Sequence, residues 1–290
     1  ISVMNQKSRN LHPGYNNRLD DSNFENTGNE LRSPPFQDIL LLRNVIPLIV
    51  FFIAFRILSH YIKKFAWQNA HGFRQYRLQN LTICIIHSTI SGGFVVLFTI
   101  WNPFAMFSEP LHWYQPWSRY VLLMSMGYFF HDIVDMLQYE VSKFTVELIL
   151  HHLVSAFVFA CIICARKFIP FGFLALLMEA NSIFLHARTL MQLSGYAPKS
   201  PMIFKLVQYL NLITFVVVRF GVQLWQANWL LRNYNHISTF FFILGIGGCT
   251  IFLIINTCLL IRILASDGYL GEFGRKHAAI NRDDPAKKEE

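Results

Sequence analysis

The fold is decided by residues 120–137, YVLLMSMGYFFHDIVDML, and residues 144–165, FTVELILHHLVSAFVFACIICA. Each segment approaches the roughly 20 residues that a helix needs to cross the hydrocarbon core of a bilayer. Only residues 138–143 separate the two segments. We therefore expect antiparallel neighbouring helices whose adjoining ends lie at the same membrane face.

Six ionisable side chains interrupt these segments: His131, Asp132, Asp135, Glu147, His151 and His152. A charge at the bilayer centre costs roughly 2.5–3.5 kcal/mol on insertion scales, so we expect these groups to face the interior of a helix bundle. Two interpretations stay open. The groups form a cluster that acts as acid and base or binds a metal, or they form a hydrogen-bonded clasp near the headgroups. Because H-E-x-x-H and other metal signatures are absent from the sequence, we predict no metal and no cofactor.

The composition of the whole chain supports a membrane protein. Of its 290 residues 53% are hydrophobic and only 14% are charged, against about 25% charged in soluble domains. Apolar residues surround the predicted helices instead of forming one stripe, which argues against a soluble helical protein. We predict an all-α polytopic fold with seven transmembrane helices, near residues 39–61, 81–101, 120–137, 144–165, 168–187, 207–224 and 239–263.

The net charge of +8 is explained by topology. Lys and Arg concentrate in alternate loops, for example at Lys63, Lys64, Arg74 and Arg77 after the first helix. The positive-inside rule then places the N-terminus outside or in a lumen and the C-terminus in the cytosol. Basic residues do not cluster with aromatic residues in a soluble region, so we expect no nucleic-acid partner.

The chain is expected to divide into four parts. Residues 1–37 are polar and are predicted to form a disordered arm. Residues 38–70 hold the first transmembrane helix and a basic loop, residues 71–264 hold the other six predicted helices, and residues 265–290 form a disordered cytosolic tail. The chain opens on Ile1, which leaves open whether residues precede it. All five cysteines fall inside predicted helices, so we expect no structural disulfide in an exposed loop.

Two later helices also carry polar residues inside the membrane. Glu179, Asn181, Ser182 and His186 interrupt residues 168–187, and Asn211 and Arg219 interrupt residues 207–224. Arg219 lies near mid-helix and needs a partner, for which Glu179 is the candidate. The pair either fixes helix packing or contacts a substrate.

Two other classes of seven-helix protein fit poorly. A seven-helix receptor would carry Asp-Arg-Tyr after its third helix and Asn-Pro-x-x-Tyr in its seventh, and neither motif is present. A small-solute transporter would have helices broken by Gly or Pro at matched positions in two halves. Only Gly92-Gly93 and Gly245-Ile246-Gly247-Gly248 approach that pattern.

Several spaced motifs together resemble the TLC-domain membrane proteins. They are Gly127-Tyr128-Phe129 with Asp132 and Asp135, Glu147 with His151-His152, Met178-Glu179-Ala180-Asn181-Ser182, Asn211, and Val218-Arg219-Phe220. The similarity runs over residues 71–264 and looks closest to the branch of TLC domain-containing proteins one and two. It implies a six-helix TLC core preceded by one additional N-terminal helix.

The resemblance also implies a function. Members of this branch are thought to limit incorporation of polyunsaturated chains into phospholipids and so to maintain plasma-membrane fluidity. The expected partners are membrane phospholipids or acyl chains, and the sequence leaves open which proteins it contacts. The plasma membrane is the expected location, with the endoplasmic reticulum as the alternative. The polar residues predicted to line a lipid cavity are His131, Asp132, Asp135, Glu147, His151, His152, Glu179, Asn181, His186, Asn211 and Arg219.

Ceramide synthases, in the same superfamily, suggest an acyl-CoA-dependent lipid acyltransferase as the alternative. Their His-Asp-x-x-Asp motif follows the His-His pair by one helix, whereas His131-Asp132 and Asp135 here precede it. The equivalent place reads 178-MEANS-182, without the histidine that could serve as base. We therefore lean towards a protein without catalytic activity. If it is an enzyme, the candidates are His151, His152, Glu147 and Glu179.

Overall fold

The computed structural model describes residues 28–139 and 143–271, which are helical with no strand among them. Seven helical units are long and apolar enough to cross a membrane. They are α1 (Leu42–Phe65), α2 (Gly72–Trp101), α4 (Ser118–Tyr139), α5 (Lys143–Ala165), α6 (Ile169–Leu177) with α7 (Glu179–Leu193), α8 (Pro201–Thr214) with η4 (Phe215–Phe220) and α9 (Gly221–Arg232), and α10 (Thr239–Ser266). The predicted all-α fold with seven transmembrane helices is confirmed.

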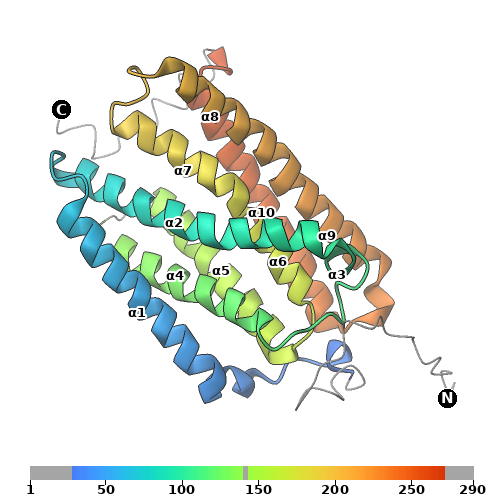
Figure 1. Ribbon diagram of the computed structural model, residues 1–290. Helices are drawn as coiled ribbons and strands as arrows, with labels where there is room; N and C mark the ends of the chain where they lie inside the picture. Colours follow the sequence, from blue (N-terminus) through green and yellow to red (C-terminus); the bar gives the residue numbers. More distant parts are fainter. Residues whose placement is uncertain (1–27, 140–142, 272–290) are drawn as a thin grey trace, which may run out of the picture.

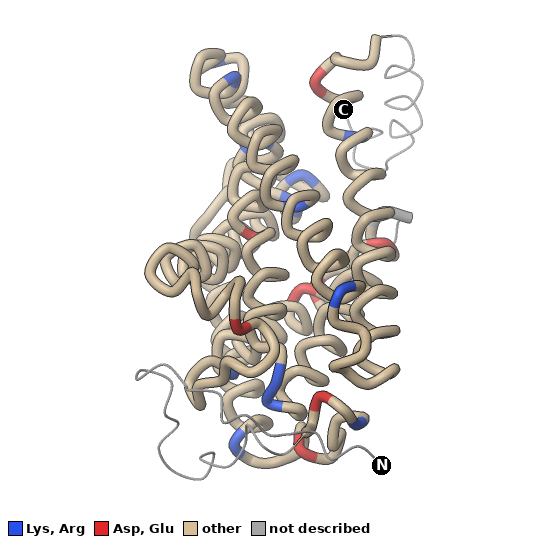
Figure 2. Tube along the Cα trace, turned by 90° about the vertical axis from the view of Figure 1, so that its right-hand side faces the viewer, with Lys and Arg blue, Asp and Glu red and all other residues tan. Residues whose placement is uncertain are grey.

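The long helices form one bundle. α1 packs against α4 and α2, α2 packs closely against α7, and α7 packs against α8. Figure 1 shows α1 and α4 at one edge of the bundle, α8, α9 and α10 at the other, and α5, α6 and α7 between them. Figure 2 shows long stretches of helix without charged residues, with a few charged positions inside the bundle. This distribution fits a multi-pass membrane protein.

Two of the spans are irregular where they pass the bundle interior. α6 ends at Leu177 and α7 begins at Glu179, so the fifth span turns at Met178. The sixth span contains a π-helical turn, Phe215–Phe220, which widens the helix around Arg219. π-helical turns within α-helices occur frequently at functional sites. Both irregular turns place polar side chains toward the same interior space.

The segment before α1 differs from the predicted disordered arm. Residues 28–37 contain η2 (Asn29–Leu31) and the start of η3 (Phe36–Leu40), and they pack on the bundle. The Ser238 backbone N–H donates to the Glu30 carbonyl at 2.6 Å, and Phe36 stacks on Phe157. The prediction of disorder is therefore wrong for residues 28–37, because aromatic and backbone contacts hold this segment against the bundle. Residues 1–27 lie outside the described part of the chain.

The predicted tail boundary also shifts. α10 continues to Ser266, and the Asp267 carboxylate accepts hydrogen bonds from Arg188 on α7 and Gln208 on α8. Residues 265–267 therefore belong to the folded bundle. Residues 272–290 of the predicted tail lie outside the described part of the chain.

Gly92 allows α2 and α7 to approach closely, and replacing it is expected to destabilise the fold. A Cβ at position 92 would lie 2.6 Å from the Ala180 backbone nitrogen. Gly92→Ala should therefore cost about 1–3 kcal/mol of stability, because the two backbones must separate. Gly93→Ala is the matched control, since a Cβ there meets nothing within 4 Å. Thermal unfolding of the purified protein in detergent measures both, and equal melting temperatures would contradict the prediction.

Candidate functional site

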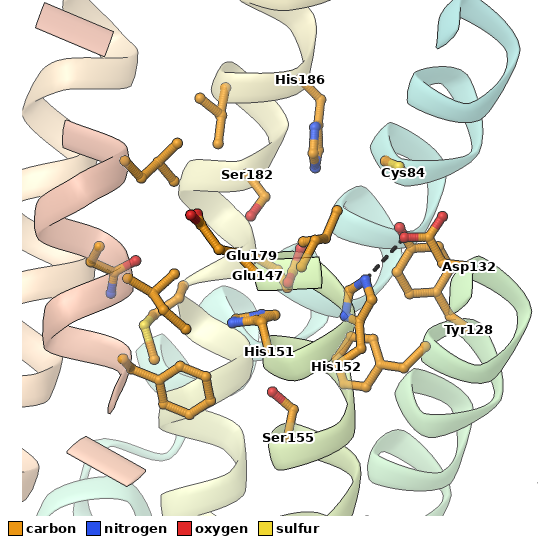
Figure 3. Close-up of a pocket in the computed structure, with 18 of the residues that line it drawn as sticks. Cys84, Tyr128, Asp132, Glu147, His151, His152, Ser155, Glu179, Ser182 and His186 are labelled. Atoms are coloured by element: carbon orange, nitrogen blue, oxygen red, sulfur yellow. Dashed lines mark hydrogen bonds and ion pairs between the residues drawn. The ribbon is translucent and has the colours of Figure 1, made fainter. Parts of the chain in front are cut away.

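A cavity of about 210 Å³ lies inside the bundle, between α2, α4, α5, the α6–α7 turn, η4 and α10. Apolar side chains such as Phe129, Phe159 and Leu176 make up much of its wall. Three carboxylates (Asp132, Glu147, Glu179) and three arginines (Arg77, Arg219, Arg262) also line it, so the formal charges on the wall balance. Figure 3 shows the polar side chains converging on this space from several helices.

Asp132 and His152 form the most clearly defined polar pair of the cavity. Asp132 Oδ2 on α4 lies 2.9 Å from His152 Nε2 on α5, and Asp132 Oδ1 accepts a hydrogen bond from Asn80 Nδ2 at 2.8 Å. Both residues are buried. An ionised carboxylate only accepts hydrogen bonds, so when Asp132 is ionised, His152 donates from Nε2. The dashed line in Figure 3 marks the pair.

Glu179 also lines the cavity, at the start of α7. Its carboxylate accepts a hydrogen bond from Ser88 Oγ at 2.6 Å, and Oε2 lies 4.0 Å from Nδ1 of the fully buried His87. His87 in turn stacks on Tyr128, with ring centroids 3.8 Å apart. α2 therefore supplies the partners of a carboxylate on α7, in the region where Gly92 brings the two helices together.

Arg219 is held by neutral side chains, which corrects the predicted pairing with Glu179. Its guanidinium donates to Asn181 Oδ1 at 2.7 Å, Ser182 Oγ at 2.8 Å and Asn256 Oδ1 at 2.9 Å. Among the described residues, Arg219 and Glu179 form no ion pair. The planar guanidinium fork reaches three acceptors on two helices at once, so Arg219 joins η4 to α7 and α10.

At one end of the cavity Glu147 pairs with Arg262. Arg262 donates to both carboxylate oxygens, at 2.7 and 2.9 Å, and so links α5 to α10. The side chains of Glu147 and Arg262 are 43% and 33% exposed, whereas those of Asp132 and His152 are 3% and 7% exposed. Glu147 and Arg262 therefore form part of the cavity rim, and the Asp132–His152 pair lies inside.

The structure brings together seven of the eleven predicted polar residues and places four elsewhere. Those that line the cavity are Asp132, Glu147, His151, His152, Glu179, His186 and Arg219. Asp135 instead contacts Lys63 Nζ at 2.6 Å and Arg56 at 3.5 Å on α1, and His131 stacks on Phe55. Asn181 and Asn211 lie behind Arg219, bonded to each other. The prediction that these four residues line the cavity is wrong, because their side chains join neighbouring helices instead.

Several lining residues were missed by sequence reasoning. They are Asn80, Cys84, Ser155 and Arg262, together with Tyr128, which was named only in a family motif, and Arg77, which was noted only as a topology signal. The available signal was spacing: Ser155 follows His151 by four residues, so one face of α5 presents both. Asn80 had no such signal, because its role depends on the position of α4. No group of three or more His, Cys, Asp or Glu among the described residues is arranged to hold a metal ion.

The family model of the TLC domain matches residues 77–265. This chain belongs to the TLC domain family. The matched residues hold six of the seven candidate spans, from α2 to α10, and α1 precedes them as the predicted additional helix. The cavity lies wholly within the TLC domain.

Curated relatives agree with this assignment. TLC domain-containing protein 2 of Danio rerio is 27% identical over 213 residues, covering 73% of this chain and 85% of the relative. TLC domain-containing protein 2 of Homo sapiens is 29% identical over 216 residues, with coverages of 74% and 81%. TLC domain-containing protein 1 of Homo sapiens is 29% identical over 178 residues, with coverages of 61% and 70%. No solved structure matches the chain.

Proposed function

We propose that this protein regulates the acyl-chain composition of membrane phospholipids and thereby membrane fluidity. In this proposal it limits the incorporation of polyunsaturated chains, and it does so by binding an acyl chain or a phospholipid in the bundle cavity. Membership of the TLC domain family supports a role connected with membrane lipids. The plasma membrane, with the C-terminus in the cytosol, is the proposed location, in agreement with the basic α1–α2 connection.

The observation that carries the proposal is the chemistry of the cavity. Its wall combines apolar side chains with a few convergent polar groups, which is the usual character of a small-molecule site. It lies among membrane-spanning helices, where the available ligands are lipids. An acyl chain would contact Phe129, Phe159 and Leu176, and its ester or headgroup would meet the polar side chains near His151 and His152.

Cells that lack the protein test this function. When they are fed polyunsaturated fatty acid, their phospholipids should contain more polyunsaturated chains than those of cells expressing it, as measured by mass spectrometry. Re-expression of the wild-type chain should restore the profile. An unchanged acyl profile in the deficient cells would contradict the proposal.

A second candidate function is acyl transfer to a lipid from acyl-CoA. The Asp132–His152 pair favours it, because a carboxylate that orients an imidazole is the usual support for a general base. His152 would accept the proton of an attacking hydroxyl or amine. The absence of a histidine at Met178, where the resemblance to ceramide synthases places one, counts against ceramide synthesis itself.

If the protein is an acyltransferase, His152→Ala should lower its activity by about 10²–10⁴-fold, the usual contribution of a general base. The assay incubates purified protein with acyl-CoA and a lysophospholipid or a long-chain amine and follows the acylated product. His131→Ala is the matched control, because His131 is a buried imidazole on α4 outside the cavity wall. Absence of product with the wild-type protein would leave the non-catalytic function.

A further inference from the structure

The helices that enclose the cavity pack loosely at the seam between α5 and α10. α10 supplies five lining residues, Phe252, Ile255, Asn256, Leu259 and Arg262, and His151 of α5 meets Phe252 edge to face at 5.0 Å. α10 packs sparsely against α5 and against η4, whereas α2 and α7, or α4 and α5, pack closely. In the most apolar stretch of α10 only 6% of the residues are buried inside the bundle, against 61% in the corresponding stretch of α4.

Both helices of the seam also present apolar side chains to the outside of the bundle. Leu150 and Leu153 on α5, and Leu253 and Ile254 on α10, are exposed large hydrophobic residues on membrane-length helices. In a bilayer such side chains contact acyl chains. A path through the seam would therefore lead from the hydrocarbon of the membrane directly into the cavity, without passing through water.

An ion pair and two glycines of α10 would allow α10 to separate from α5 at this seam. The Glu147–Arg262 ion pair is a polar link across the seam, and its partial exposure makes it inexpensive to separate. Further along α10, Gly247 and Gly248 face open space, since an added Cβ would meet no atom within 4 Å, and glycine weakens a helix interior relative to alanine. Beyond these glycines the helix is anchored, since Phe241 is buried and Ser238 bonds to Glu30.

We infer that the ligand enters the cavity sideways from the membrane, between α5 and α10, and that the Glu147–Arg262 pair closes this entrance. The inference rests on the proposed lipid-binding function and specifies its ligand class: a lipid dissolved in the bilayer, not an acyl carrier dissolved in water. After entry the polar part of the lipid lies near His151 and His152, and its chain lies toward Phe159. Loading then requires the cavity end of α10 to move away from α5.

A reversible bridge across the seam tests the inference. Glu147→Cys and Arg262→Cys are combined with Cys258→Ser, which removes an exposed native thiol. A bifunctional methanethiosulfonate reagent links the two new cysteines, and reductant releases them. The protein is placed in phosphatidylcholine vesicles that carry a phospholipid with a photoactivatable acyl chain. The measured quantity is the initial rate at which light attaches this lipid to peptides of the cavity wall.

Bridging should slow the labelling at least about tenfold, since a closed gate limits ligand exchange, and reductant should restore it. Each single-cysteine variant treated with the same reagent should label at the unbridged rate. Equal rates for the bridged and released protein would overturn the lateral entrance. If a photoactivatable acyl-CoA added from water labels the bridged protein faster than the membrane phospholipid does, the lateral entrance is also overturned, in favour of an aqueous route. Absence of cavity labelling in the wild-type protein would instead contradict lipid binding itself.

Discussion

Replacing Asp132 with asparagine is expected to reduce lipid occupancy of the cavity by at least about tenfold while the bundle remains folded. Asp132 holds His152 by a charge-assisted hydrogen bond and accepts a second bond from Asn80. An asparagine of the same shape still accepts from Asn80, but its neutral amide no longer anchors the His152 Nε2–H as a carboxylate does. Hydrogen bonds to charged groups contribute about 1.5–3 kcal/mol, and about 1.4 kcal/mol corresponds to tenfold in binding.

The measurement is lipid bound to the purified protein, by native mass spectrometry, together with rescue of the acyl profile in deficient cells. Asp135→Asn is the matched control on the same helix. Asp135 bonds to Lys63 and approaches Arg56, so its replacement should loosen α1 from α4 and lower the melting temperature. It should leave the lipid occupancy unchanged. Similar lipid occupancy in the two variants would contradict the assignment of Asp132 to the site.

Replacing Arg219 with alanine is expected to cost about 3–5 kcal/mol of stability, because each buried acceptor left without its donor costs about 1–3 kcal/mol. Three acceptors lose their donor at once: Asn181, Ser182 and Asn256. They lie among membrane-spanning helices, where water does not replace the lost bonds. The junction between η4, α7 and α10 should separate first.

Arg232→Ala is the matched control, because Arg232 is an exposed arginine at the end of the same span. It should change stability by less than about 0.5 kcal/mol, as is usual for surface substitutions. Size-exclusion profiles of the detergent-solubilised protein after stepwise heating compare the two variants. A melting temperature for Arg219→Ala as high as that for Arg232→Ala would contradict the structural role of the network.

Local sequence patterns were sufficient for the framework of the protein. Runs of apolar residues predict the seven spans, because each must match the thickness of the hydrocarbon core. Of the six ionisable groups in residues 120–165, His131, Asp132, Asp135 and His152 are buried in the bundle, as expected because hydrocarbon tolerates them poorly, whereas Glu147 lies at the partly exposed rim. The order of Asp132, His151-His152, Glu179 and Arg219 indicated the TLC domain family, which the family model confirms.

The contacts that each polar side chain makes within the bundle could not be predicted from local sequence patterns. Asp132 and Asp135 are three residues apart, which separates their directions by about 60° on a helix. That difference is enough for Asp132 to meet α5 and the cavity, while Asp135 meets Lys63 on α1. Similarly, Arg219 was assigned to Glu179 by charge, yet the π-helical turn directs it to two asparagines and a serine.

The sequence by itself determined the number of spans, the family and the set of side chains that must avoid lipid. The tertiary structure alone decided which of them share a cavity and which fasten one helix to another. The physical reason is that periodicity specifies only the face of its own helix on which a side chain lies. What that face meets depends on close approaches such as Gly92 to Ala180, which join parts of the chain distant in sequence.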